Sequence, residues 1–177
     1  DVARIEVLRG AQSTLWGSQA IGGVVNIVTA EPASAFEGQV QAEAGSDKTA
    51  AISAAAGGVL ERLVWRLGAS HYVTDGAASA FADGDETDGY RNTQVSGRVR
   101  VEVLDNLSVD LRTIYSKARN DYDGFPPPFY GFADTPQYGE TESLVAYAGL
   151  NLALLDGALK NRLAYGYSRI DRDDIEP

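Results

Sequence analysis

Residues 1–31 have the sequence DVARIEVLRGAQSTLWGSQAIGGVVNIVTAE, and this stretch decides how the whole chain is interpreted. A short strand of alternating charged and apolar residues is predicted to end at Arg9-Gly10. A turn of small residues follows, and the pair Gly22-Gly23 precedes an apolar strand over 24–28. We expect four glycines to allow a tight backbone path and close packing of a small sheet, namely Gly10, Gly17, Gly22 and Gly23.

A phosphate-binding loop is the main alternative for these glycines. A dinucleotide-binding loop needs Gly-x-Gly-x-x-Gly after a strand and before a helix. Here the glycine pair precedes a strand, and no Gly-Lys-Ser/Thr follows. The context therefore disfavours nucleotide binding.

Composition excludes several classes of function. The 177 residues include 25 acidic and 15 basic residues, and this net charge of −10 argues against nucleic acid as a partner. There is no cysteine, so neither a disulfide framework nor a thiolate metal site is available. The sequence has no run of about 18 apolar residues, so it predicts no transmembrane helix. Barrel strands of about 9–11 alternating residues remain compatible with the sequence.

After residue 35, segments of alternating polarity predict seven strands. The clearest is 93–103, where valines fill one face and Arg98 and Arg100 lie on the other. In a barrel these arginines must face the lumen, because a charge on the lipid face at the midplane costs about 2–4 kcal/mol. The strands are predicted over 36–45, 49–57, 62–73, 93–103, 107–117, 142–154 and 159–170, with further mid-strand arginines Arg66, Arg112 and Arg162.

Connector lengths favour a barrel over a soluble sandwich. The predicted connectors 58–61, 104–106 and 155–158 are short, whereas 74–92 and 118–141 are long; only the first hairpin, 46–48, breaks the alternation. Short turns alternating with long loops are the plan of outer-membrane barrels. Seven strands alone leave two unpaired edges, which hydrocarbon does not tolerate.

Residues 1–31 resemble the end of the plug domain of TonB-dependent outer-membrane receptors, whose consensus is roughly IERIEVLRGPxSxLYGxxAIGGVINIIT. The departures are Ala11 for proline and Trp16 for tyrosine. The resemblance implies a mainly all-β chain: a partial antiparallel transmembrane β-barrel preceded by the end of an α+β plug. The whole barrel would have about 22 strands around a plugged lumen. We expect an internal fragment in the bacterial outer membrane, with the C-terminal part of the plug domain over 1–31, a linker over 32–35 and the first roughly seven barrel strands over 36–177.

The resemblance also implies a plug–barrel contact, because the family holds arginines near this motif against glutamates of the wall. We therefore expect Arg9, with Glu6 and Arg4, to contact the barrel. Glu37 and Glu43 are local candidate partners, and a solvated strand face is the alternative.

Acidic and aromatic residues concentrate in the predicted long connectors. Carboxylates at alternate positions suit Ca²⁺, and the layout resembles the extracellular hairpins of cobalamin transporters in the family. The alternative is a solvated acidic loop. The candidate calcium ligands are Asp83, Asp85, Asp88, Asp121, Asp123 and Asp134, and no other cofactor is expected. Phe125, Phe129, Tyr130 and Phe132 flank a Pro126–Pro128 run and either bind an apolar ligand or pack the loop.

The sequence gives no support to catalysis: His71 is the single histidine, there is no cysteine, and no serine stands in a Gly-x-Ser-x-Gly turn. The resemblance implies TonB-dependent transport of a scarce, large ligand, with cobalamin as the first expectation and a ferric siderophore or another metal chelate as the alternative. The partners would be outer-membrane lipid and TonB, the latter through a box upstream. A soluble β-sandwich or adhesin-like binding module is the competing class.

Overall fold

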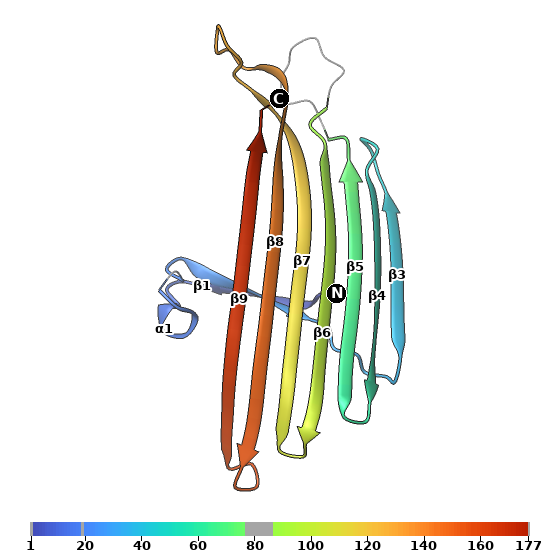
Figure 1. Ribbon diagram of the computed structural model, residues 1–177, viewed down its shortest axis with the longest axis vertical. Coiled ribbons are helices and arrows are strands. Elements are labelled where there is room, and N and C mark those ends of the chain that lie inside the picture. Colours follow the sequence, from blue (N-terminus) through green and yellow to red (C-terminus); the bar gives the residue numbers. More distant parts are fainter. Residues whose placement is uncertain (1, 19, 77–86, 177) are drawn as a thin grey trace.

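The computed structural model describes residues 2–18, 20–76 and 87–176, and it contains two antiparallel sheets (Figure 1). The first sheet pairs strand β1 (Val2–Arg9) with β2 (Gly23–Thr29), and the single-turn helix α1 (Ser13–Trp16) lies between them. The second sheet joins seven strands in chain order, each antiparallel to the next. They are β3 (Glu37–Ala44), β4 (Ala50–Leu60), β5 (Leu63–Thr74), β6 (Tyr90–Leu104), β7 (Leu107–Gly124), β8 (Ala133–Leu154) and β9 (Leu159–Ile175). The prediction of a mainly all-β chain with an open segment of barrel wall is confirmed.

No helix among the described residues is long and apolar enough to span a bilayer.

Glycine is required at three of the four predicted positions of the β1–β2 sheet. Gly10 and Gly17 have φ of +91° and +90°, a backbone region that side-chain-bearing residues avoid. At Gly23 (φ +152°) a Cβ would lie 2.6 Å from the Leu8 carbonyl oxygen. Gly22 has open space around it, so its glycine has no comparable steric reason.

Two predicted connectors are wrong, because the strands are longer than their alternation suggests. Strand β4 continues to Leu60, so the predicted connector 58–61 shrinks to a turn over 61–62. Strand β7 extends to Gly124 and β8 begins at Ala133, so most of the predicted 118–141 connector is strand. In this upper part the outward side chains become charged; Lys117, for example, lies 2.9 Å from Glu142 across the ladder. Polarity on both faces removes the period-two signal while the backbone ladder persists.

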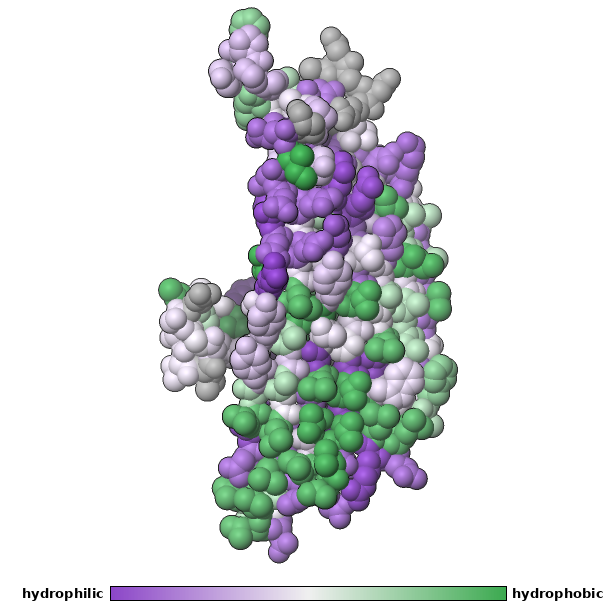
Figure 2. All heavy atoms as spheres, viewed as in Figure 1, coloured by the Kyte–Doolittle hydropathy of each residue, from purple (hydrophilic) through white to green (hydrophobic). Residues whose placement is uncertain are grey.

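The seven-stranded sheet has one apolar face and one arginine-bearing face, and the apolar face is the exposed one. Leu67, Leu111 and Leu163 all lie open on it. Among the described residues of the seven-stranded sheet, no aliphatic or aromatic side chain is buried, so this sheet has no soluble-type core. Figure 2 shows the apolar residues gathered over the lower half of the strands, below a hydrophilic upper part. A water-soluble sandwich would bury that face against a second sheet.

The β1–β2 sheet lies on the opposite side, against the arginine-bearing face. Figure 1 draws β8 and β9 in front of it. An open cleft of about 770 Å³ separates the two sheets, with Asn26 and Thr29 of β2 on one side and Arg98, Arg112 and Tyr147 on the other. The apolar face therefore stays available to lipid while the charged face meets the β1–β2 sheet.

Adjacent alanines at the centre of β4 test this assignment, because Ala54 lies on the apolar face and Ala55 on the arginine-bearing face. We expect Ala54→Arg to destabilise the full-length protein by about 2–4 kcal/mol, the penalty for arginine at a bilayer midplane. Ala55→Arg is the matched control, and it should change the free energy of unfolding by no more than about 0.5 kcal/mol. Urea unfolding in phospholipid vesicles measures both. Equal losses for the two variants would contradict the assignment of the faces.

Candidate plug–wall interface

The arginine-bearing face is organised around one buried carboxylate. Asp110 of β7 has a side chain only 3% exposed and accepts hydrogen bonds from both Arg112 and Arg98. Arg112 is bidentate, with Nε 3.0 Å from Oδ1 and Nη2 2.6 Å from Oδ2. Arg98 Nη2 lies 3.2 Å from the same Oδ2. A carboxylate buried this far needs such partners, because an unpaired buried charge is strongly destabilising.

Strand register explains why the arginines meet. Arg98 of β6 lies directly opposite Arg66 of β5 on one side and Arg112 of β7 on the other, so three like charges form one row across the sheet. Like charges directly opposite each other are destabilising unless they are neutralised. Asp110 neutralises part of the row, and Glu37 contacts Arg66 at 2.9 Å.

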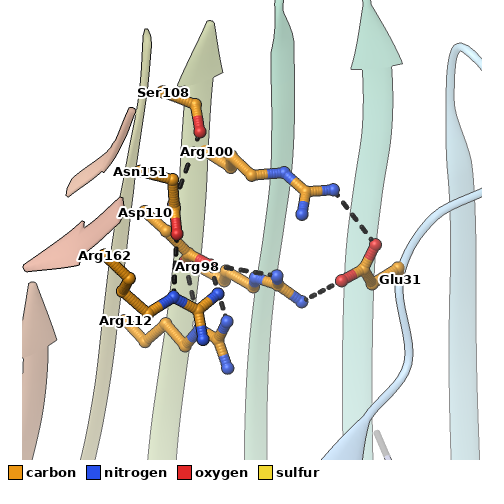
Figure 3. A network of polar contacts seen from close by, with 8 residues as sticks. All are labelled: Glu31, Arg98, Arg100, Ser108, Asp110, Arg112, Asn151 and Arg162. Atoms are coloured by element: carbon orange, nitrogen blue, oxygen red, sulfur yellow. Dashed lines mark hydrogen bonds and ion pairs between the residues drawn. The ribbon is translucent and has the colours of Figure 1, made fainter. Parts of the chain in front are cut away.

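A second carboxylate comes from the segment between the two sheets. Glu31 Oε1 lies 2.7 Å from Arg98 Nη1, and its Oε2 lies 3.3 Å from Arg100 Nη2 (Figure 3). Three residues later, the Ser34 carbonyl accepts a hydrogen bond of 2.9 Å from the Val59 amide of β4. The chain leaving β2 is therefore fixed to the wall at two points, one ionic and one through the backbone.

Two of the residues predicted to contact the barrel, Arg4 and Glu6, pair with each other within the β1–β2 sheet, and Arg4 also lines the cleft that faces the wall. Arg4 Nε donates to Glu6 at 2.6 Å, and Asn26 Nδ2 donates to the other oxygen of Glu6 at 2.8 Å. The hydrogen bond from Arg4, and to a smaller extent that from Asn26, lowers the pKa of Glu6. Arg9 forms no ion pair within the described part of the chain, so its contact with the wall stays a prediction. Glu37, one of its candidate partners, binds Arg66, and Glu43 accepts a hydrogen bond from Gln41.

Sequence reasoning missed Glu31, although a signal was present. This residue ends the plug motif directly after an apolar strand, and the lumenal arginines predicted on the wall need counter-charge. The family resemblance implies the reverse arrangement, with arginines on the plug and carboxylates on the wall. Among the described residues, the ion pairs that join the segment after β2 to the wall have the opposite polarity, with a carboxylate on the segment and arginines on the wall.

Of the four candidate calcium ligands that the structure describes, three lie in strands rather than in a loop. Asp121 lies in β7, 2.9 Å from Arg119, and Asp123 accepts a hydrogen bond from the Thr135 amide. Asp134 lies in β8, and Asp88 precedes β6. Asp83 and Asp85 lie outside the described residues. Over the part that the structure describes, no three acidic or histidine side chains form a metal-binding group, so calcium stays a prediction.

The four candidate aromatic residues lie at the β7–β8 end of the sheet. Phe125 and Phe132 contact each other across the base of the 125–132 loop, with ring centroids 5.4 Å apart. Phe129 and Tyr130 lie at its tip, 92% and 69% exposed. The base is thus packed within the loop, whereas the tip offers aromatic surface to a ligand.

Comparisons with known proteins agree with this arrangement, although no family model matches the chain. The chain is 31% identical over 159 residues to the vitamin B12 transporter BtuB of Photobacterium profundum, covering 88% of this chain and 25% of that protein. It is 29% identical over 138 residues to a probable TonB-dependent siderophore receptor of Acinetobacter baumannii, covering 70% of this chain and 18% of the relative. A 40-residue stretch, 23% of this chain and 6% of the relative, is 55% identical to an iron-regulated outer membrane virulence protein of Vibrio cholerae.

These homologues confirm the predicted resemblance to TonB-dependent receptors and the predicted outer-membrane location. The Photobacterium relative is named a transporter, the Acinetobacter relative a receptor and the Vibrio relative a virulence protein. None of these names is that of an enzyme. The chain spans about a quarter or less of the length of these relatives.

Asp110→Asn tests the ionic core of the interface. Removing the charge between Arg98 and Arg112 should destabilise the full-length protein by roughly 3 kcal/mol, the lower end for a broken buried pair, because Arg112 remains partly exposed. Asp105→Asn is the matched control: it breaks a pair with Arg62 in an exposed turn and should cost at most about 1 kcal/mol. Urea unfolding in vesicles measures the difference. Similar losses of unfolding free energy for both variants would show that the Asp110 ion pairs contribute no more to stability than an exposed pair.

Proposed function

We propose that this chain is the plug-to-wall segment of a TonB-dependent transporter that carries a scarce, large ligand across the bacterial outer membrane. The observation that carries the proposal is the position of the β1–β2 sheet on the arginine-bearing face, joined to β6 through Glu31. An element held on the inner side of a lipid-facing wall can close the lumen. It can also move without breaking the ladder of the wall.

The proposed mechanism is a two-state gate. The ligand first binds at the end of the wall that carries the 125–132 loop. TonB then acts on a box upstream of this segment, and the energy that it delivers loosens the plug. Ligand can signal its presence only if it binds the two states with different affinity. In this region, releasing the segment that follows β2 would break the Glu31 ion pairs and the Ser34–Val59 hydrogen bond but no strand pairing of the wall.

Cobalamin is our first proposal for the ligand, and a relative that is named a vitamin B12 transporter supports it. A ferric siderophore or another metal chelate is the alternative, supported by a relative named a siderophore receptor. We propose that the exposed tip residues Phe129 and Tyr130 meet an apolar part of the ligand, with outer-membrane lipid covering the opposite, apolar side of the wall.

Uptake in cells that lack their own cobalamin receptor tests the transport proposal. Cells expressing the full-length protein should accumulate labelled cyanocobalamin when TonB is present and lose this uptake when TonB is deleted. A labelled ferric siderophore supplied in parallel distinguishes the alternative ligand. Uptake of neither compound, or uptake that is independent of TonB, would contradict the proposal.

The tip of the 125–132 loop gives a second prediction. Phe129→Ala should weaken ligand binding roughly 5- to 30-fold, because truncating an aromatic anchor costs about 1–2 kcal/mol. Leu155→Ala is the control, since Leu155 is also highly exposed but lies in the turn at the other end of the sheet. Equilibrium binding to the purified full-length receptor measures both. Unchanged affinity for Phe129→Ala would remove the loop tip from the ligand site.

Calcium gives a third prediction. We propose that Asp83, Asp85 and Asp88, with Asp121, Asp123 and Asp134, supply carboxylates for Ca²⁺ and order the ligand-facing end. Calorimetric titration of the refolded full-length receptor with cyanocobalamin should then show an affinity gain of about tenfold with calcium, lost when EDTA is added. Asp85→Asn should abolish the gain and Asp105→Asn should preserve it. No calcium-dependent gain would eliminate the calcium site.

A further inference from the structure

We propose that Arg98 and Arg100 form an oxyanion site on the wall that Glu31 occupies while the plug segment is seated. When that segment moves, a carboxylate or phosphate group of the transported ligand takes the place of Glu31. The role in transport rests on the proposed function, whereas the anion site itself rests on the charges and geometry of the wall.

The geometry is that of a site for two anionic oxygens. Arg98 and Arg100 are two residues apart on β6, so both guanidinium groups project from the same face of the strand. They meet the two different oxygens of a single carboxylate, at 2.7 and 3.3 Å. Figure 3 shows Glu31 reaching this pair from a segment outside the seven-stranded sheet. Planar guanidinium donors match the oxygens of carboxylates and phosphates particularly well.

The local charge balance makes Glu31 a necessary counter-charge. Arg98, Arg100 and Arg112 contribute three positive charges, and Asp110 and Glu31 contribute two negative ones. Asp110 is already held bidentately by Arg112. Once Glu31 leaves, three positive charges face one carboxylate, a local excess in a chain whose net charge is −10. Such an excess attracts anions to a partly enclosed cleft.

A donor left unused in the present arrangement points in the same direction. Arg98 Nε is buried and has no hydrogen-bond partner. A buried donor without a partner is energetically unfavourable, so Arg98 would gain from an additional oxygen acceptor that reaches its guanidinium group. Arg98 and Glu31 both line the cleft between the sheets, which has room, about 770 Å³, for a group much larger than one carboxylate.

Glu31 is suited to be displaced, whereas Asp110 is not. The Glu31 side chain is 48% exposed, and Glu31 lies between β2 and β3, outside both sheets. Moving it breaks two ion pairs and no rung of the seven-stranded sheet. The wall arginines are held within the β6 ladder and stay in place when the occupant changes.

Anion binding to the purified full-length protein in detergent tests the proposal without requiring transport. Citrate and inorganic phosphate are titrated separately by calorimetry at low salt, and the arm that binds identifies the preferred oxyanion. Glu31→Gln should bind one of them about tenfold more tightly than the wild-type protein, because the internal competitor has lost its charge. Glu61→Gln, in the β4–β5 turn, should behave as the wild type. Glu31→Gln binding neither anion more tightly would overturn the proposal.

A second variant separates a true site from a general loosening of the plug. Adding Arg100→Gln to Glu31→Gln should abolish the gained binding, while the circular dichroism spectrum stays that of a folded barrel. Retention of the gain in this double variant would also overturn the proposal, because the anion would then bind elsewhere. Neither measurement involves TonB or uptake, so a failed uptake experiment leaves this result interpretable by itself.

Discussion

The structure depends on one constraint: a strand that crosses hydrocarbon can carry charge on only one of its faces. Side chains alternate between the two faces, so placing Val95 and Val99 toward lipid places Arg98 and Arg100 toward the lumen. Hydrogen-bonded register then brings arginines of neighbouring strands into one row. That row needs counter-charge: Asp110 and Glu37 supply part of it from the wall, and Glu31 supplies the rest from the segment between the two sheets. Segregation of polarity thus creates both the lipid face and the ionic interface.

The sequence predicts this part of the fold well because alternation is a direct record of the two environments. The seven strands and the small sheet of residues 1–31 all appear where the pattern and the plug motif place them. The strand ends are predicted poorly for the same reason. Beyond Lys117 both faces of β7 meet water, so the alternation disappears, although the β7–β8 ladder continues to Gly124. Backbone hydrogen bonds, which do not depend on side-chain polarity, decide those ends.

The polarity of the plug–wall contact could not be predicted from residue types alone. The arginines of residues 1–31 are conspicuous in the sequence, but Arg4 is neutralised by Glu6 within its own strand. Glu31 has no carboxylate neighbour and no local cation, and its partners are 67 and 69 positions away along the chain, at Arg98 and Arg100. Only the strand register, which brings Arg66, Arg98 and Arg112 together, reveals the positive charge that Glu31 balances together with Asp110 and Glu37.

Placing the last counter-charge on a separate segment has a mechanical consequence. If every lumenal arginine were neutralised from within the wall, the plug could be held only by packing and backbone contacts. Here part of the electrostatic stability of the wall exists only while the segment of Glu31 is seated, so the segment and the wall stabilise each other. Any anion that reaches Arg98 and Arg100 competes directly with that contact and lowers the free energy needed to release the segment. In the mechanism that we propose, coupling between the ligand and the plug follows from this charge balance, without a separate chain of contacts through the barrel.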